Sequence, residues 1–301
     1  MRVAITGGTG FVGSHLLDAA IANGHSVTAL ARREQPLRDG VDWVTGDLSD
    51  RDALGNLVRE ADAVIHVAGT INAPNAAGFE AGNVSGTLAM LAAATASGIR
   101  RFVHVSSLAA REPKLSLYGG SKERAEALVM SSGLDWAIVR PPAVYGPGDK
   151  ETLELFRMAK LGLMLMPPKG RVSVIHAADL ARLLLALAAP GAPGQYLIEP
   201  DDGKPGGWGH REFARALAAA VGTKAAVISS PGFLLRLAAR ADLLLRGEKA
   251  KLTPDRAAYF SHRNWVAEPK RAPPAELWRP EIETGQGLKD TAKWYREKGW
   301  L

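Results

Sequence analysis

The sequence of 301 residues contains no cysteine. This absence excludes disulfide bonds, thiolate metal sites and a cysteine nucleophile. The sequence also lacks an apolar run long enough for a membrane span, because arginine interrupts even the segment Phe233 to Leu245. The N-terminus enters an apolar strand pattern at once, which leaves no room for a signal peptide. We therefore expect a cytoplasmic protein with no integral membrane segment.

Two further kinds of pattern are missing. The basic residues, which give a formal net charge of +6, are scattered and form no block, so we expect no nucleic-acid partner. No group of His, Asp and Glu has the spacing of metal ligands, so we expect no metal. Hydrophobic residues make up 47% and charged residues 23% of the chain, which are ordinary values for a globular protein. We expect a small-molecule enzyme, as a monomer or a homodimer.

What the sequence does contain is a glycine-rich turn, Thr6-Gly7-Gly8-Thr9-Gly10-Phe11-Val12-Gly13. An apolar run predicts a strand before the turn, and an apolar pattern of helical spacing predicts a helix after it, ending at Asn23-Gly24. This is the context of a dinucleotide-binding turn, in which glycines allow a tight bend and let the backbone approach a pyrophosphate. The positive end of the helix then faces the phosphates. The alternative is an ordinary turn between a strand and a helix.

Strands and helices alternate over the first two hundred residues, which predicts an α/β fold with a parallel sheet covered on both faces. The predicted strands are Val3–Thr6, Ser26–Leu30, Val41–Val44, Ala63–Val67, Arg101–Val105, Trp136–Val139, Val172–Ile175 and Gln195–Ile198. The main predicted helices are Ala81–Ser97, Lys122–Met130, Ala177–Ala189, Arg211–Val221, Phe233–Leu245 and Leu288–Lys298. We expect a Rossmann-type, doubly wound dinucleotide-binding domain over residues 1–199. Its loop 141–170 leans into the substrate cleft, and a smaller, mostly helical substrate lobe spans residues 200–301.

Tyr118 and Lys122 are four residues apart at the start of a predicted helix, so both project from one face. Ser106 and Ser107 follow a predicted strand at the carboxyl edge of the sheet. Together with the glycine turn, these residues resemble the extended branch of the short-chain dehydrogenase/reductase superfamily. The other pieces that match, in chain order, are Asp47-Leu48, His66-Val67-Ala68-Gly69, Asn83, Arg140-Pro141-Pro142 and Val144-Tyr145-Gly146.

The resemblance implies a catalytic set of Ser107, Tyr118 and Lys122. In this chemistry the tyrosine exchanges a proton with the substrate oxygen, and the serine holds that oxygen. A nearby lysine ammonium would favour the phenolate and so lower the tyrosine pKa, and in the family it also binds the nicotinamide ribose. The resemblance implies a wider cofactor-binding set of Gly7, Gly10, Phe11, Val12, Gly13, Arg32, Arg33, Asp47, Leu48, Ala68, Gly69, Tyr118, Lys122 and Pro141. The alternatives are that Tyr118 and Lys122 are a surface pair, that Ser107 is a helix cap, and that Ser106 is the acting serine.

Arg32 and Arg33 follow the second predicted strand, where an acidic residue would select NAD by binding the adenine ribose. Guanidinium groups at this point favour a 2′-phosphate instead, so we expect NADP as the cofactor. NAD stays possible if Arg32 only stacks on the adenine and Arg33 is solvated. Asp47 would accept a hydrogen bond from the adenine amino group, or it is a turn residue.

The sequence departs from sugar-nucleotide members of the branch. Dehydratases carry Thr-Asp-Glu near the serine, but Leu108-Ala109-Ala110 follows Ser107 here, and the interval from Ser107 to Tyr118 is short for an epimerase. We therefore expect an NADP(H)-dependent oxidoreductase that interconverts a ketone and a secondary alcohol. The alternatives are a nucleotide-sugar epimerase and a non-catalytic cofactor-binding structural or assembly protein.

The substrate is expected over Ser107, Tyr118 and Tyr145, in a cleft that the apolar segments 161–166 and 233–245 close. Because these segments are rich in leucine and methionine, we expect a medium-sized, mostly apolar substrate. Arg157, Lys160 and Arg171 keep the nucleotide-sugar alternative open. We expect the apolar side of the helix 233–245 to pack on the smaller lobe, with a pocket wall or a surface resting on lipid as alternatives. His66 and His104 are expected to be packed inside strands.

Overall fold

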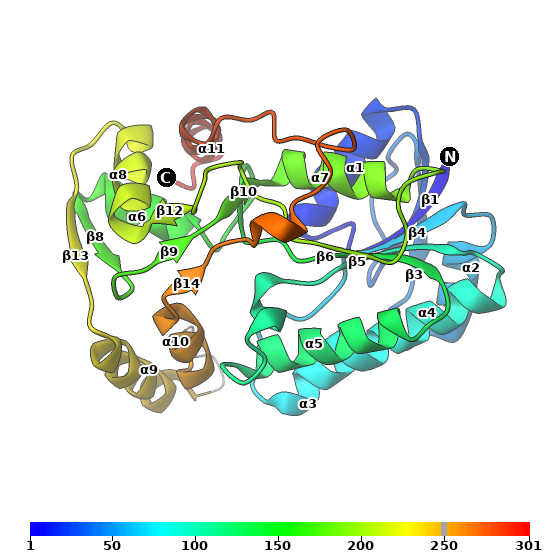
Figure 1. Ribbon diagram of the computed structural model, residues 1–301, viewed down its shortest axis with the longest axis horizontal. Coiled ribbons are helices and arrows are strands. Elements are labelled where there is room, and N and C mark those ends of the chain that lie inside the picture. The colour runs from blue at the N-terminus through cyan, green and yellow to red at the C-terminus, as the bar shows by residue number, and fades with distance from the viewer. Residues whose placement is uncertain (248–251) are drawn as a thin grey trace. The chain divides into compact units, whose positions relative to one another are not determined.

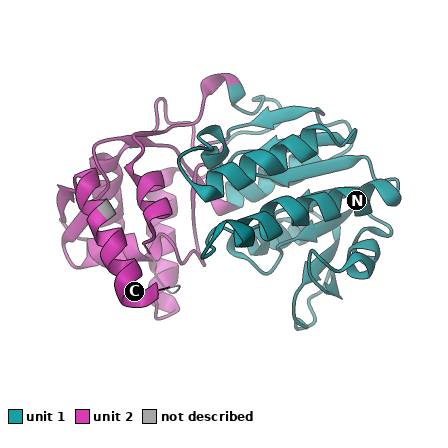
Figure 2. Ribbon diagram, turned by 90° about the horizontal axis from the view of Figure 1, so that it is seen from below, with its two compact units in different colours: residues 1–141, 178–200, 271–279 teal, residues 142–177, 201–270, 280–301 magenta. Residues whose placement is uncertain are grey.

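The computed structural model describes residues 1–247 and 252–301, apart from the side chain of Arg236. These residues form two compact units (Figure 2). Unit 1 comprises residues 1–141, 178–200 and 271–279, and unit 2 comprises residues 142–177, 201–270 and 280–301. A boundary near residue 200 was predicted. The segment 142–177 instead belongs with the C-terminal part, and the segment 271–279 returns to unit 1.

Unit 1 is built on a seven-stranded, wholly parallel sheet in the order β11-β6-β5-β4-β1-β2-β3 (Figure 1). The strands are β1 (Arg2–Thr6), β2 (Ser26–Ala31), β3 (Val41–Thr45), β4 (Ala63–His66), β5 (Arg101–Val105), β6 (Asp135–Val139) and β11 (Tyr196–Ile198). The strand order reverses between β1 and β4. This is the doubly wound arrangement, in which the crevice at the carboxyl ends of the strands near the reversal binds ligands. The predicted fold class is confirmed.

Helices cover both faces of this sheet. The helices α2 (Arg51–Val58), α4 (Gly86–Ala96) and α5 (Leu117–Met130) pack on one face, where Leu54, Met90 and Val129 join strand residues in a buried core. The helices α1 (Phe11–Ala22) and α7 (Ala177–Ala188) lie on the opposite face (Figure 1). Because both faces are covered, the central strands β1, β4 and β5 are buried along nearly their whole length, and most of their residues are apolar.

The predicted helix 81–97 is interrupted. A π-helix, Glu80–Ser85, follows the short helix α3 (Ala76–Phe79) and precedes α4. The predicted strand Val172–Ile175 is also divided, into β9 (Arg171–Val172) and β10 (Val174–His176). Ser173 lies between them, and its hydroxyl donates to Asp201 at 2.8 Å.

Unit 2 contains small sheets and five helices among its described residues. The sheets pair β10 with β7 (Ala143–Tyr145), β13 (Ala226–Ser229) with β8 (Leu163–Met166), and β9 with β12 (Trp208–Gly209) and β14 (Asn264–Trp265). The helices are α6 (Leu153–Lys160), α8 (His210–Val221), α9 (Gly232–Arg246), α10 (Pro254–Ser261) and α11 (Thr284–Glu297). The core lies among α6, α8 and α11, around Phe156, Leu217 and Tyr295. No helix within the described ranges is both long and apolar enough to span a bilayer.

Candidate active site

The glycine turn between β1 and α1 has no room for side chains at two positions. A Cβ atom on Gly7, whose φ is +77°, would lie 2.7 Å from the backbone nitrogen of Ala68. A Cβ atom on Gly13 would lie 1.9 Å from the carbonyl oxygen of Gly7. The first turn of α1 therefore packs directly against the backbone of the glycine turn. Gly10 is the N-cap of α1 and brings no side chain to the N–H groups that follow it, at Phe11, Val12 and Gly13.

The segment after β4 lies against this turn. The Thr6 hydroxyl accepts from the Ala68 backbone N–H at 3.2 Å. The buried Asn83 side chain accepts from the Thr70 N–H at 2.7 Å and donates to the Thr70 carbonyl at 2.9 Å and to the Ser121 hydroxyl at 2.8 Å. The π-helix that carries Asn83 therefore connects the segment containing Ala68 and Gly69 to α5.

Ser107 and Tyr118 are joined by a hydrogen bond between their side chains. Ser107 is also the N-cap of a 3-10 helix, Leu108–Arg111, and its oxygen accepts from the Ala109 N–H at 3.2 Å. The two interpretations of Ser107, as a cap and as a partner of Tyr118, thus hold together. Ser106 points elsewhere, because its hydroxyl donates to buried Glu126. The structure therefore brings Ser107, and not Ser106, to Tyr118.

The pKa of Tyr118 is raised above its ordinary value, because burial penalises the phenolate more than the hydrogen bond from Ser107 stabilises it. The predicted lowering of this pKa by Lys122 is wrong for this structure. The Lys122 ammonium, itself buried, donates to the Val105 carbonyl at 2.9 Å. Burial lowers the pKa of Lys122 to about 8, and the charge of Glu126 opposes that shift. Lys122 thus carries a charge at neutral pH.

Gly69 is the point where the segment after β4 meets Lys122. A Cβ atom at Gly69 would lie 3.0 Å from the Lys122 Nζ and 2.8 Å from the Asn83 Oδ1. A larger residue there would push on both side chains. The glycine thus keeps the ammonium close to the segment that carries the predicted cofactor-binding residues Ala68 and Gly69.

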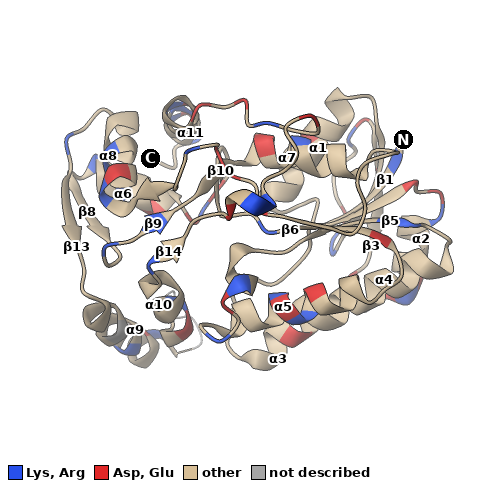
Figure 3. Cartoon of the chain, viewed as in Figure 1, with Lys and Arg blue, Asp and Glu red and all other residues tan. Residues whose placement is uncertain are grey.

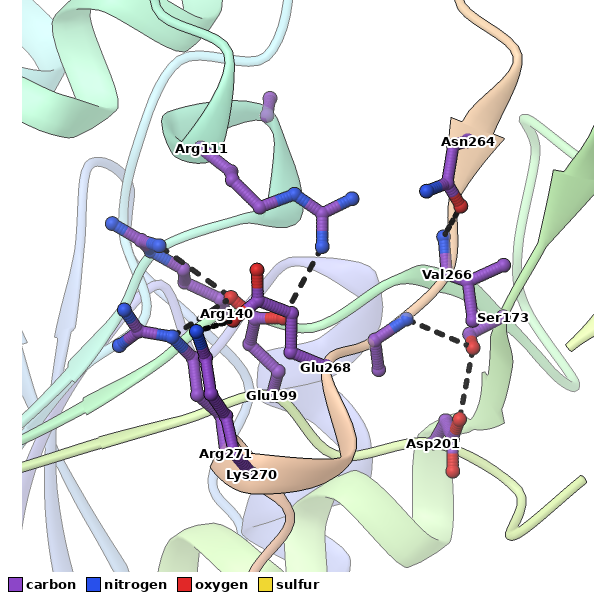
Figure 4. Close-up of polar contacts among 12 residues, drawn as sticks. Arg111, Arg140, Ser173, Glu199, Asp201, Asn264, Val266, Glu268, Lys270 and Arg271 are labelled. Carbon is purple, nitrogen blue, oxygen red and sulfur yellow. Dashed lines mark hydrogen bonds and ion pairs between the residues drawn. The ribbon is translucent and has the colours of Figure 1, made fainter. Parts of the chain in front are cut away.

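A buried ionic network holds α5 against the strand ends, and the sequence analysis did not find it. Arg140 binds both oxygens of Glu126 through Nε at 2.8 Å and Nη2 at 2.6 Å, and its Nη1 lies 3.5 Å from Glu199. Arg111 and Arg271 also approach Glu199, at 3.4 Å and 3.7 Å (Figure 4). The available signal was the spacing: Glu126 follows Lys122 by four residues and so lies on the same face of the helix.

Arg32 and Arg33 are exposed and directly follow β2, so no acidic side chain occupies the position that selects NAD. Asp47 is also exposed, and its Oδ1 accepts from the Ser49 N–H at 2.8 Å and from the Ser49 hydroxyl at 2.6 Å. These bonds, and more weakly the charge of Arg32, lower the pKa of Asp47. The turn role foreseen for Asp47 is therefore present, and Arg32 lies near enough for its charge to act on this carboxylate.

The remaining predicted cofactor-binding residues are also in unit 1. Phe11 and Val12 are half-buried in the first turn of α1, and Leu48 packs so close to the start of α4 that a Cβ on Gly86 would lie 2.5 Å from its Cδ1. Pro141 is buried after β6, and its carbonyl accepts from the Leu108 N–H at 3.1 Å. That bond ties the 3-10 helix after Ser107 to the end of β6.

Comparison with known proteins places this site in a family. A family model described as NAD(P)H-binding matches residues 7–189, more than half of the chain. The chain is an extended short-chain dehydrogenase/reductase. It is 39% identical to "Ceramide reductase" of Caulobacter vibrioides, over 99% of this chain and 96% of that protein.

Two further reductases are similar to this dehydrogenase/reductase over most of their length. A "4-hydroxy-2-methyl-3-oxo-4-farnesyl-3,4-dihydroquinoline-1-oxide ketoreductase" of Stigmatella aurantiaca is 32% identical over 79% of each chain. A "2-alkyl-3-oxoalkanoate reductase" of Stenotrophomonas maltophilia is 31% identical over 74% of this chain and 76% of that protein. The protein is accordingly an NAD(P)-dependent oxidoreductase.

Solved structures agree on the fold. The structure titled "MoeE5 in complex with UDP-glucose and NAD" superposes with a TM-score of 0.76 at 20% identity and covers 99% of both chains. "Crystal structure of gox2253" superposes with a TM-score of 0.77 at 20% identity, over 100% of this chain and 99% of that chain. At this identity the likeness establishes the fold only.

Three expectations about the substrate region need correction. Tyr145 lies in the buried core of unit 2, 1% exposed, and its hydroxyl donates to the Thr284 carbonyl at 3.5 Å, so it does not line an open cleft. Only part of the segment 161–166 could contact a substrate, because Met164 and Met166 are buried in the same core. On α9, Leu234, Leu237, Ala241 and Leu244 are exposed and do not pack on the lobe as predicted.

His66 and His104 are buried inside their strands, as predicted, with ring centroids 5.5 Å apart. The His66 ring bonds to the Thr6 hydroxyl at 2.7 Å and to the Thr87 hydroxyl at 3.2 Å. Neither ring nitrogen of His104 has a hydrogen-bond partner among the described residues. No three potential metal ligands cluster in the part of the chain that the structure describes.

Proposed function

We propose that this oxidoreductase uses NADPH to reduce a ketone on a long-chain, apolar substrate to a secondary alcohol, with Ser107, Tyr118 and Lys122 as its catalytic residues. The observation that carries the proposal is the hydrogen bond between Ser107 and Tyr118, with the Lys122 ammonium one helical turn further along α5. This arrangement offers a proton donor and a second hydroxyl to one substrate oxygen.

The residues around the glycine turn fit a dinucleotide. Side chains at Gly7 and Gly13 would collide with backbone, so the turn keeps its surface open for close approach, and Gly10 leaves the first N–H groups of α1 without a side-chain cap. Phe11, Val12, Ala68 and Gly69 border this turn. When bound, the nicotinamide supplies a hydride to the carbonyl carbon.

The protein's own residues handle the proton. Because burial raises its pKa, Tyr118 is a protonated phenol at neutral pH, which suits a donor to the ketone oxygen. Solvent then returns a proton to the phenolate left by that transfer. We assign the charged Lys122 to the ribose hydroxyls of the nicotinamide. Ser107 holds the ketone oxygen beside the Tyr118 hydroxyl. Glu126 and Arg140 fix the helix that carries Tyr118 and Lys122.

We propose NADPH over NADH because Arg32 and Arg33 follow β2 and are exposed there. A guanidinium group can bind a 2′-phosphate through paired, charge-assisted hydrogen bonds. No carboxylate stands directly after β2 to bind the ribose hydroxyls of NAD. Asp47, which is predicted to accept a hydrogen bond from the adenine amino group, has one oxygen committed to Ser49.

The substrate class follows from the relatives that share most of this chain. Their names include a ceramide, a farnesyl-substituted 3-oxo compound and a 2-alkyl-3-oxoalkanoate, each with an extended hydrocarbon portion. Two of these names contain a 3-oxo group, which is a ketone that a reductase could take. We therefore propose a long-chain 3-oxo lipid, such as an N-acylated long-chain base with a ketone at C3.

A substrate panel tests the proposal. Purified protein is mixed with NADPH and a 3-oxo long-chain base, its N-acyl derivative or a 2-alkyl-3-oxoalkanoate, and nicotinamide absorbance is followed. In a parallel reaction it is mixed with UDP-glucose and NAD or NADP, and the sugar product is analysed. We expect oxidation of NADPH with at least one of the lipids. Conversion of UDP-glucose without net oxidation would identify an epimerase, and tight NADPH binding without turnover on the whole panel would favour a structural role. Either of those results contradicts the proposal.

A further inference from the structure

Helix α9 has its apolar side turned outward. At about 100° per residue, Phe233, Leu234, Leu237, Ala241, Leu244 and Leu245 fall on one side of the helix, and all six are exposed. Phe233 is 60%, Leu237 61% and Leu244 87% exposed. In an ordinary surface helix of a globular protein this stripe would face the core. Here the core-facing side is a different one.

The opposite side of α9 anchors it to unit 2. Ala239 is fully buried, and half-buried Asp242 accepts from the Leu252 N–H at 2.8 Å and pairs with Arg246 at 3.2 Å. The helix also packs on α10. These contacts fix the orientation of α9 and leave its apolar stripe exposed to solvent.

The strand that leads into α9 continues the apolar surface. Ile228 on β13 and its register partner Leu165 on β8 are 51% and 54% exposed, and Leu163 is exposed as well. Only Ser230 and Pro231 separate β13 from α9, and the Ser230 N–H donates to the Met166 carbonyl at 2.8 Å. The chain runs from β13, which lies beside β8, into α9 (Figure 1), and exposed apolar residues are present in all three elements.

The charge of this part of the chain is strongly positive. Residues 224–263 contain eight Lys or Arg and three Asp or Glu, a formal charge of +5 out of +6 for the whole protein. Figure 3 shows basic positions on both α9 and α10. Arg240 is exposed beside the apolar stripe, on the turn between Leu237 and Leu244. Exposed Leu and Phe flanked by basic residues are the composition of a helix that lies in the interface of an anionic bilayer.

We propose that α9 docks this protein on the surface of a membrane containing anionic lipids, with Phe233, Leu237 and Leu244 entering the boundary between headgroups and acyl chains. A second copy of the chain fits the surface less well, because a two-fold interface would place two segments of charge +5 against each other. The inference goes beyond the proposed reaction and does not rest on it, because vesicles without substrate test it.

Vesicle sedimentation with the full-length protein tests the docking. Vesicles of phosphatidylcholine alone are compared with vesicles that are about one third phosphatidylglycerol. We expect the protein to partition onto the anionic vesicles on the order of 10-fold more strongly and to be released by high salt. The double variant Leu237→Glu/Leu244→Glu should lose at least on the order of 10-fold in partitioning, and Arg240→Glu should lose mainly the preference for anionic lipid.

The matched control is Leu37→Glu, which changes a fully exposed leucine of unit 1 and should leave partitioning unchanged. NADPH binding and the melting temperature of each variant establish that it is folded. Equal partitioning of wild type and Leu237→Glu/Leu244→Glu would overturn the proposal. A second result would also overturn it: the wild type does not bind vesicles, but it sediments as a dimer that Leu237→Glu/Leu244→Glu dissociates. The partner on the apolar stripe would then be a second copy of the chain.

Discussion

Tyr118 is the residue whose environment bears most directly on the proposed proton transfer. Its raised pKa keeps the hydroxyl protonated, Ser107 is hydrogen-bonded to it, and the buried Lys122 ammonium stays charged up to about pH 8. A residue that starts as an acid is prepared to protonate a ketone oxygen. In the proposed reaction Ser107 holds the substrate oxygen, and Lys122 binds the nicotinamide ribose.

Replacing Tyr118 by Phe keeps the ring and removes the proton. We expect turnover of an accepted ketone to fall by on the order of 10²-fold or more, with NADPH affinity changed little. Steady-state rates and fluorescence titration with NADPH measure the two quantities. Tyr196→Phe, at a more exposed tyrosine on β11, is the control and should retain full activity. A Tyr118→Phe variant of nearly normal rate would refute the assigned role of the hydroxyl.

Arg32 tests cofactor selection. Arg32→Ala removes an exposed guanidinium after β2, so we expect NADPH affinity to fall by about 10- to 100-fold, equivalent to about 1.5–3 kcal/mol for a charge-assisted hydrogen bond. NADH affinity should hardly change, because it has no 2′-phosphate. Titration calorimetry with both cofactors gives the ratio. Arg100→Ala, at another exposed arginine, controls for net charge. Equal losses for both cofactors would argue that Arg32 only stacks on the adenine.

At the scale of elements, the glycine turn shows what a sequence pattern can predict about steric contacts and what it cannot. The order of strand, glycines and helix predicted where β1, the turn and α1 lie, and the structure confirms all three. The pattern did not reveal that Gly13 lies against the Gly7 carbonyl, since that contact depends on how α1 leaves the turn.

Alanine substitutions at two helical glycines distinguish the destabilising effect of a steric clash from the stabilising effect of higher helix propensity. Gly13→Ala should destabilise the protein by about 1–3 kcal/mol or more and abolish NADPH binding, because backbone must move to admit the Cβ. Gly55→Ala lies in α2, where nothing approaches a Cβ within 4 Å, and should stabilise by about 0.5–1 kcal/mol. Denaturant unfolding measures both. A harmless Gly13→Ala would show that the turn is looser than described.

Sequence periodicity predicted the parallel sheet and most helices, because core-facing apolar residues form continuous runs in buried strands and recur every three to four residues in helices. The resemblance to the family, and not the periodicity, predicted Ser107, Tyr118 and Lys122 as one catalytic set. Periodicity could not predict Tyr145, which follows a family motif but lies in the core of unit 2, because tertiary packing decides burial. For the same reason it misplaced the apolar side of α9. A helical stripe predicts that something covers it, without saying whether that is protein or lipid.

For the whole molecule, two buried histidines link stability to pH. Burial, and next the charge of Lys122, lower the pKa of His66 to about 3 and that of His104 well below 6.5. Below pH 6.5 the unfolded chain therefore binds more protons than the folded chain. Each histidine then contributes stability at neutral pH that is lost as the pH falls, at about 1.4 kcal/mol per pH unit.

Two leucine variants separate the histidines. His104→Leu should be close to neutral or stabilising near neutral pH, because both ring nitrogens lack a hydrogen-bond partner among the described residues. It should also make the loss of stability between pH 6.5 and the acid range less steep. His66→Leu should destabilise by about 1–3 kcal/mol, since it removes one buried hydrogen bond from each of the hydroxyls of Thr6 and Thr87. Urea unfolding at several pH values measures both. Equal destabilisation by the two variants would contradict this description of His104.

The central claim is net hydride transfer to a ketone, and isotopic labelling tests it most directly. In a single turnover, the protein is given NADPH deuterated at the transferable position of the nicotinamide and a long-chain 3-oxo lipid, and the products are examined by mass spectrometry. We predict one secondary alcohol with one deuterium on its carbinol carbon for each NADP formed. No deuterium in any lipid product, with the label left in the reduced cofactor, would contradict the account, as would isomerisation of UDP-glucose in a parallel reaction that contains the oxidised cofactor.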